Sequence, residues 1–199
     1  MKAIIFDFDV VLADTADFNK NLTKEVGHDV SEEEFKAHHD GNVMEQPRIP
    51  FTKESADNFF AKYLERITQV KPFFSQENIH LLKSLCPLYI ISSSPKSAIN
   101  KFLKCNNLEY FDEVLGVDFH KSKVEKFKYL FKKYSLNPND VIFVSDTLGD
   151  ILEAKNVDVK TIAVDFGFHD RIRIKKGNPF KIVSNFDELL ETIKDFRKP

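Results

Sequence analysis

The sequence predicts an α/β protein with a parallel sheet, into which a small all-helical domain is inserted after the first strand. From about residue 75 onward, short apolar runs rich in β-formers alternate with helical patterns, and this alternation is typical of parallel sheets. Between residues 14 and 72 every periodic segment has the helical spacing of apolar residues. We therefore expect a core domain formed by residues 1–13 and 73–199 and a helical domain formed by residues 14–72.

Composition narrows the class of protein. The chain has 199 residues, 42% of them hydrophobic and 30% charged, which is enough for one core with an insertion. No run approaches the roughly 18 apolar residues of a spanning helix. A formal charge of −2 argues against nucleic-acid or anionic-membrane partners. Cys86 and Cys105 lack metal-ligand spacing, so we expect a reducing, cytoplasmic location. Nothing in the sequence indicates an oligomeric state.

The first predicted strand carries the strongest chemical signal. An apolar run from Ala3 to Phe6 is followed by Asp7 and Asp9, and then by a second apolar patch from Val10 to Ala13. Residues i and i+2 share a face while a strand remains extended. Two carboxylates held so close repel each other unless a cation lies between them or one is protonated. The pair therefore predicts a metal site, an acid/base pair, or both.

The segment from residue 14 to residue 72 should form three helices. Apolar spacing predicts helices over 16–26 and 54–70, and Ser31 with Glu34 forms a capping box that opens a shorter helix. Glycine, asparagine and two prolines predict a loop over 38–50. Within that loop, the run from His38 to Asp40 is interpreted as surface or loop residues, and Arg48 as a solvated side chain.

The rest of the chain alternates helices and strands. Ser94 and Pro95 are interpreted as the N-cap and first residue of a helix, and Ser122 with Glu125 as a second capping box. The basic run 171–176 is interpreted as an exposed edge or loop. The expected elements are, in order, a helix over 76–85, a strand over 88–92, a helix to residue 105, a strand over 114–117, a helix from 122, strands over 141–145 and 161–164 flanking a helix over 151–156, a strand over 181–183 and a helix over 186–196.

Reactive side chains occur at four places where a predicted strand ends or a helix begins. These are Asp7 with Asp9, Ser92 with Ser93, Lys121 with Lys123, and Asp146 with Asp150. Each group alone is common at turns and helix caps. Because the carboxyl ends of parallel strands meet at one edge of the sheet, we expect the four groups to form one site.

In order and placement, four segments resemble the motifs of the haloacid dehalogenase superfamily, and within it the phosphatase-like members with a helical cap inserted after the first motif. The segments are FDFDVVLADT, ISSSP, HKSKVEK and FVSDTLGD. The resemblance implies a Rossmann-like core with a helical cap over residues 14–72. It also implies a bound Mg²⁺ and hydrolysis of a small phosphorylated metabolite, a phosphomonoester, through an aspartyl-phosphate.

The resemblance also assigns roles to the carboxylates. Asp7 is expected to be the nucleophile and Asp9 the general acid and base. Mg²⁺ is expected on the Asp7 carboxylate, the backbone carbonyl of Asp9 and Asp146, with Asp150 close to the metal or just outside its ligands. Members that displace halide from carbon typically lack an acidic residue at the position of Asp9, so the sequence favours phosphate chemistry.

The remaining motif residues are expected to bind the phosphate. Ser92 would do so through its hydroxyl and Ser93 through its backbone N–H. The motif lysine is either Lys121 or Lys123, and its expected position at the start of a helix favours Lys123. Two residues depart from the pattern, Val10 and Ser145, because glycine is usual at both positions. Val10 is expected to restrict the turn after Asp9.

Two alternatives remain open from the sequence. A phosphosugar mutase would use the same residues and return the phosphoryl group to the sugar. A catalytically slow regulatory or binding protein would keep the fold and the metal site, and Val10 is the residue that favours it.

Overall fold

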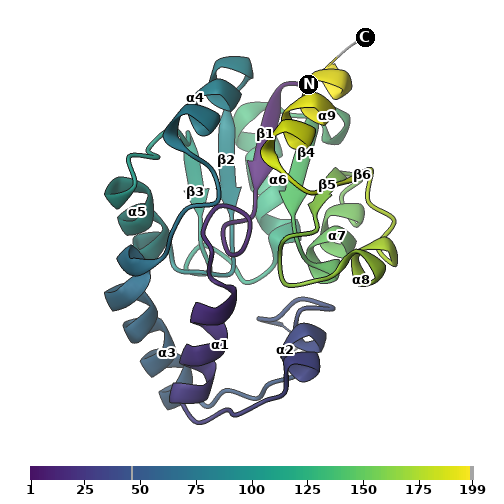
Figure 1. Cartoon of the computed structure of the whole chain (residues 1–199). Helices are drawn as coiled ribbons and strands as arrows, with labels where there is room; N and C mark the ends of the chain where they lie inside the picture. Colours follow the sequence, from purple (N-terminus) through teal and green to yellow (C-terminus); the bar gives the residue numbers. More distant parts are fainter. Residues whose placement is uncertain (46, 198–199) are drawn as a thin grey trace.

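The computed structural model describes residues 1–45 and 47–197. Its centre is a six-stranded parallel sheet in the order β3-β2-β1-β4-β5-β6 (Figure 1). The expected α/β fold with a parallel sheet is confirmed. The strands are β1 (Ala3–Phe6), β2 (Leu88–Ile91), β3 (Glu113–Leu115), β4 (Val141–Ser145), β5 (Lys160–Val164) and β6 (Lys181–Val183).

Helices cover both faces of this sheet and extend beyond one end of it. In chain order they are α1 (Ala16–Glu25), α2 (Glu32–His38), α3 (Lys53–Arg66), α4 (Gln76–Leu85), α5 (Lys96–Cys105), α6 (Lys123–Tyr134), α7 (Leu148–Lys155), α8 (Arg171–Lys175) and α9 (Phe186–Arg197), with 3₁₀ turns η1 (Ile67–Gln69) and η2 (Pro138–Asp140). Among the described residues, no helix is long and apolar enough to cross a membrane.

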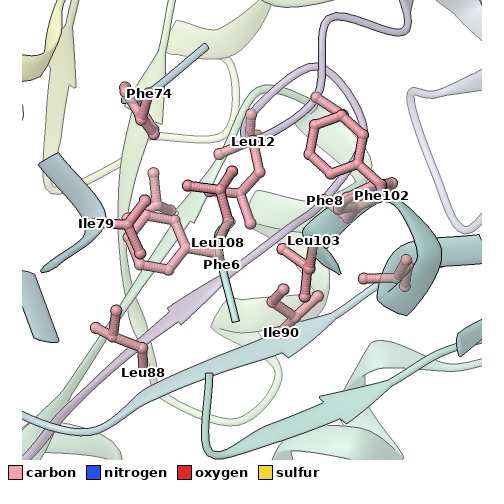
Figure 2. Packing of buried hydrophobic residues seen from close by; sticks show 14 of the residues in the cluster. Phe6, Phe8, Leu12, Phe74, Ile79, Leu88, Ile90, Phe102, Leu103 and Leu108 are labelled. Carbon is pink, nitrogen blue, oxygen red and sulfur yellow. The ribbon is translucent and has the colours of Figure 1, made fainter. Parts of the chain in front are cut away.

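Strand β1 lies at the centre of the sheet and supplies both halves of the core. Ile4 and Phe6 pack into the cluster that α4, α5 and α9 cover, whereas Ala3 and Ile5 pack into the cluster beneath α6 and α7. Figure 2 shows the first cluster, in which Phe6 lies among side chains from β2, α4 and α5. Because both faces are buried, the strand is a continuous apolar run, as expected for a central parallel strand.

The turn after β1 places Val10 in a strained conformation. Its φ of +53° lies in the left-handed region, which a β-branched residue adopts only at a cost of about 1–2 kcal/mol. The side chain is 1% exposed and packs with Phe35, Ile49 and Phe168. The expected restriction of this turn is therefore present, and packing of Val10 under α2 offsets its strain.

Helices α1, α2 and α3 form a cap beyond the carboxyl ends of the strands (Figure 1). The chain enters and leaves the cap at one place, where Ala13 bridges to Pro72. Asp14 N donates to Lys71 O over 2.9 Å at the same crossing. This pairing supports a cap of residues 14–72, and the domain boundaries themselves stay a prediction.

Helix α2 and the residues after it bring the cap onto the core. The N–H of Gly149 in α7 donates to the carbonyl of His39 over 3.1 Å, and His169 Nε2 lies 2.8 Å from the carbonyl of Lys36. A Cβ built on Gly149 would lie 2.4 Å from the carbonyl oxygen of Gly41. Only glycine therefore allows the cap backbone to approach α7 this closely.

The basic run after β5 was wrongly interpreted as an edge or loop. Residues 171–175 form α8, and Arg173 pairs with Glu33 at 2.7 Å and with Asp40 at 2.8 Å. Arg173 thus binds acidic groups of the cap, a pairing that the local sequence does not reveal, whereas Arg171 pairs with Asp165 of the core. Arg48 also pairs with Asp40, at 3.5 Å.

The expected N-cap of α5 is wrong, because Pro95, not Ser94, has that position. Ser122 is the N-cap of α6, as expected, but the expected capping box is wrong, because the Ser122 side chain makes no capping bond to the helix. At α6, Glu153 of α7 takes that place: its Oε1 accepts from the backbone N–H of Lys123 over 2.9 Å and from the hydroxyl of Ser122 over 3.2 Å. A carboxylate from another helix thus satisfies the first turn of α6.

His39 lies in the turn after α2, as expected for a loop residue, but its side chain is partly buried. Its ring stacks on Phe168 at 4.6 Å, and its Nδ1 lies 2.9 Å from the carbonyl of Phe35. Burial, with a smaller contribution from His38, lowers the pKa of His39 to about 3. The folded protein therefore holds this ring neutral.

Substitution of Val10 tests the strain in the turn. Val10→Ala should reduce the free energy of unfolding by about 1–3 kcal/mol, because buried methyl groups are lost while the left-handed φ remains. Val10→Gly removes one more buried carbon but relieves about 1 kcal/mol of strain, so it should be no less stable than Val10→Ala. Chemical denaturation measures both. A glycine variant clearly less stable than the alanine variant would contradict the strain.

The buried ring of His39 predicts a loss of stability in mild acid. The unfolded ring takes up a proton below pH 6.5, whereas the folded ring stays neutral down to about pH 3. The free energy of unfolding should therefore fall between pH 7 and pH 5, by about 1–2 kcal/mol for this group. Urea denaturation at both pH values should show a smaller fall in His39→Gln. An equal fall in the two proteins would assign the acid sensitivity to other groups.

Candidate active site

A cavity of about 350 Å³ lies between the carboxyl ends of the strands and the cap. The core contributes Asp7, Asp9, Asp146 and Asp150, and the cap contributes residues of α1, α2, α3 and the loop between α2 and α3. Because β1 and β4 are adjacent in the sheet, the residues that follow them lie side by side. The sequence-predicted carboxylates are thus brought together at one place.

Lys123 joins three of the elements that form this cavity. Its Nζ lies 2.9 Å from Asp7 Oδ1, after β1, and 2.5 Å from Asp150 Oδ2, in α7. Burial opposes the charged ammonium, but these two carboxylates outweigh it and raise the pKa of Lys123 above its usual value. Lys121 also lines the cavity, and its side chain is exposed. The structure therefore places Lys123, and not Lys121, on Asp7.

The two carboxylates on Lys123 have opposite pKa shifts. Burial raises the pKa of Asp7 well above its usual value, since Lys123 offsets burial only in part and neighbouring carboxylates add to it. Burial also acts on Asp150, but Lys123 and the Ser145 hydroxyl, which donates to Asp150 Oδ2 over 2.5 Å, together lower its pKa. Asp150 is therefore the carboxylate that stays ionised beside Lys123, whereas Asp7 takes up a proton more readily.

Asp146 leaves one oxygen unused. Its Oδ2 accepts from the N–H of Phe168 over 2.8 Å, whereas its buried Oδ1 has no hydrogen-bond partner. Burial raises the pKa of this carboxyl to about 7. A Cβ on Gly167 would lie 2.2 Å from the Asp146 Cβ, so glycine lets the chain pass close behind it. A buried acceptor without a partner calls for a cation or a donor.

The charges of the site fit a divalent cation. The buried groups Asp7, Asp146 and Asp150 carry three negative charges when ionised, and buried Lys123 carries one positive charge, which leaves two negative charges before Asp9 is counted. Within residues 1–45 and 47–197, no group of three His, Cys, Asp or Glu side chains has the geometry of a metal site. The expected ligands include only two carboxylates, with the Asp9 carbonyl as the third, and Mg²⁺ accepts waters for the rest.

Asp9 is held by four donors. Its Oδ1 accepts from the hydroxyl of Tyr63 over 2.7 Å, from that of Thr15 over 2.8 Å and from the Asn19 amide over 3.2 Å. Its Oδ2 accepts from the Ser94 hydroxyl over 2.6 Å. Tyr63 belongs to α3 and Asn19 to α1. The cap therefore orients the second aspartate directly.

The serines after β2 are divided between the core and the cavity. Ser93 and Ser94 line the cavity, whereas Ser92 is fully buried and its hydroxyl accepts from the N–H of Ser94 over 2.9 Å. The buried ammonium of Lys126 donates to the Ser92 carbonyl over 2.5 Å, and burial lowers the pKa of Lys126 to about 8. The expected phosphate contacts of Ser92 and Ser93 stay a prediction.

Sequence reasoning missed the residues that hold the aspartates. Tyr63 fits the apolar stripe of its helix, and Ser94 before a proline has the pattern of a cap. The sequence pattern marks Ser145 only as a residue where glycine is usual, but its hydroxyl donates a hydrogen bond to Asp150. One signal was available in the sequence: the segment ISSSP has three serine hydroxyls, whereas a helix cap requires only one.

Comparisons with known proteins agree with this geometry. Residues 4–164 match the family described as haloacid dehalogenase-like hydrolase. A predicted phosphatase from Clostridium acetobutylicum has the same fold, with a TM-score of 0.81 over 98% of both chains and 20% sequence identity.

Two curated relatives are phosphoglycolate phosphatases. The protein from Photorhabdus laumondii subsp. laumondii is 29% identical over 146 residues, and that from Vibrio parahaemolyticus is 23% identical over 145 residues. Each alignment covers 71% of this chain, but only 62% and 64% of the respective relative. The chain thus matches less than two thirds of their length. Since the family match covers most of the sequence and includes both strands that carry the aspartates, the chain belongs to the haloacid dehalogenase-like hydrolases.

Proposed function

We propose that this protein is a Mg²⁺-dependent phosphatase that hydrolyses a small phosphomonoester through an aspartyl-phosphate. The observation that supports it most is the pair Asp7 and Asp9 in one capped cavity, with Lys123 on the first and four hydrogen-bond donors on the second. One carboxylate is thus beside a fixed positive charge, and the other is oriented separately. This division suits a nucleophile and a proton carrier.

In the first step, an Asp7 carboxylate oxygen attacks phosphorus. A bond forms between that oxygen and phosphorus while the bond from phosphorus to the alcohol oxygen breaks. The proton of the Asp9 carboxyl moves to the departing oxygen, so that a neutral alcohol leaves. The products of this step are the alcohol, ionised Asp9 and a phosphoryl group on Asp7.

In the second step, Asp9 takes a proton from water, whose oxygen attacks the same phosphorus. The bond between phosphorus and Asp7 breaks, which releases inorganic phosphate and restores the Asp7 carboxylate. Asp9 is again protonated and ready for the next ester. The four donors keep the Asp9 carboxylate in one place between the two proton transfers.

Both displacements bring a phosphate dianion against carboxylates, so positive charge is required. Lys123 supplies one charge at Asp7. Asp7, the carbonyl of Asp9 and Asp146 would hold Mg²⁺, and the unpartnered Asp146 Oδ1 supports this assignment. When bound, the ion would neutralise charge that develops on the phosphoryl oxygens. Ser92, Ser93 and Lys123 would bind the phosphate.

The curated relatives support a phosphomonoester as substrate, because phosphoglycolate belongs to that class. Their names are no assignment of the substrate of this chain. Product analysis separates the phosphatase from a mutase, which yields an isomer and little free phosphate.

Asp7→Asn tests the proposed nucleophile. The amide keeps the shape of the side chain but cannot accept a phosphoryl group, so phosphate release should fall at least about a hundredfold. A panel of phosphomonoesters with Mg²⁺ and with chelator measures this, and circular dichroism checks the fold. Asp187→Asn on the exposed face of α9 is the matched control and should keep full activity. Full activity of Asp7→Asn would show that Asp7 is not the nucleophile.

Asp146→Asn tests the proposed metal site without an activity assay. In the metal-free protein at pH 8, removal of a buried carboxylate whose pKa is raised should increase Tm. Mg²⁺ should raise the Tm of the original protein by mass action, and it should raise that of Asp146→Asn much less. Asp187→Asn should keep the full rise. An undiminished Mg²⁺ effect in Asp146→Asn would place the ion elsewhere.

A further inference from the structure

The wall that the cap contributes to the cavity is mainly apolar. Its side chains include Phe35, Val43, Met44, Phe51, Phe59 and Phe60. These residues come from α2, α3 and the segment between them. Because the phosphate must lie at the carboxylates of the core, the rest of a substrate would extend towards this wall. Burial of apolar surface there would favour an apolar group.

The same wall offers no positive charge to an anionic group. Among the described residues that line the cavity, the lysines are Lys121 and Lys123, and both come from the core. Lys123 is bound to Asp7 and Asp150. The two arginines within residues 14–72, Arg48 and Arg66, pair with Asp40 and Glu25 respectively, and neither lines the cavity. A carboxylate buried against the apolar wall would therefore receive no counter-charge from the cap, and Lys121, whose side chain is exposed, is the one lysine among the described lining residues without a carboxylate partner.

The two histidines in the cavity wall do not supply that charge. His38 Nδ1 accepts from the backbone N–H groups of Arg48 and Ile49, at 3.1 and 3.3 Å, so this nitrogen carries no proton. His39 stacks on Phe168. Burial lowers the pKa of His38 to about 4 and that of His39 to about 3. Both rings are neutral at physiological pH.

One polar atom in the wall calls for a donor. The amide nitrogen of Asn19 donates to Asp9, which fixes the orientation of the amide, and its buried Oδ1 has no hydrogen-bond partner. Asn19 lines the cavity. A carbonyl oxygen beside the Asp9 carboxylate repels an anion but accepts from a hydroxyl or N–H group. A substrate with such a donor near the ester would satisfy it.

We propose that the substrate is the phosphomonoester of an uncharged, mainly apolar alcohol with a hydrogen-bond donor near the ester oxygen. This inference rests on the proposed phosphatase function and adds to it the chemical class of the leaving group. It separates this chain from the phosphoglycolate phosphatases that it resembles, because glycolate carries a carboxylate next to the ester carbon.

Two esters that differ only at the far end provide the sharpest test. In butyl phosphate the chain ends in a methyl group, whereas in 4-phosphooxybutanoate it ends in a carboxylate, and the leaving oxygens are nearly equal in basicity. We expect kcat/KM for phosphate release to be at least about tenfold higher for butyl phosphate. Phosphoglycolate should be a poorer substrate than 2-hydroxyethyl phosphate, which replaces its carboxylate with a hydroxymethyl group.

A charge added to the cap should weaken this preference. Phe60→Lys places an ammonium on the apolar wall, so the ratio of kcat/KM for the carboxylate ester to that for butyl phosphate should rise at least about fivefold. Ile172→Lys adds the same charge on α8 at a side chain that is 78% exposed and outside the cavity. This control should leave the ratio unchanged. An equal rise in both variants would overturn the role of the cap wall.

Binding to Asp7→Asn separates the failure of this inference from the failure of the phosphatase proposal. Calorimetry with the same two esters should show tighter binding of butyl phosphate. Tighter binding without turnover by the unaltered protein would remove the phosphatase proposal and keep the preference for an apolar group. Turnover with the carboxylate ester or phosphoglycolate preferred would overturn this inference alone. Binding of neither ester would overturn both.

Discussion

The site depends on one buried ammonium. Lys123 Nζ contacts Asp7 after β1 and Asp150 in α7, and its own backbone N–H is bound by Glu153. Two core helices and the central strand are therefore joined through a single residue that is only 2% exposed. Loss of one partner of such a buried pair costs about 3–5 kcal/mol, because the remaining charge keeps its desolvation penalty. The positive charge that the proposed mechanism uses is thus also a condition for the arrangement of the carboxylates.

The cap not only encloses the cavity but also supplies hydrogen-bond donors to one of its carboxylates. Asp9 follows the central strand, but Tyr63 and Asn19, which orient its carboxylate, belong to cap helices. The hydroxyl of Tyr63 and the carbonyl of Lys36 are both cap groups bonded to the core. Without the cap helices Asp9 would lose the donors of Tyr63 and Asn19, so the alignment of Asp9 in the proposed proton transfers depends on the cap being in place. This coupling would favour proton transfer only when the cavity is enclosed.

The fold and the carboxylates could be predicted from sequence because both follow from local patterns and one rule of sheet geometry. Apolar runs located the strands, and the carboxyl ends of parallel strands brought Asp7 and Asp146 together. The expected start of α6 favoured Lys123 over Lys121 for the same local reason, and the resemblance supplied the order of the motifs. The errors concern side chains whose partners are distant in sequence. Ser94 forms a hydrogen bond with Asp9, 85 residues away in sequence, and Arg173 forms one with Glu33, 140 residues away. The residues around each side chain do not indicate such a distant partner. His39 is enclosed by packing against Phe168, which the loop composition did not indicate.

Gly149 determines how closely the cap can approach helix α7. The cap backbone occupies the place where any larger residue at this position would carry its Cβ, so the absence of one methyl group defines how closely the two domains approach. This distance in turn sets the depth of the space above the carboxylates. A larger residue at position 149 would therefore move the cap backbone away from α7 and widen the cavity without any change in the carboxylates.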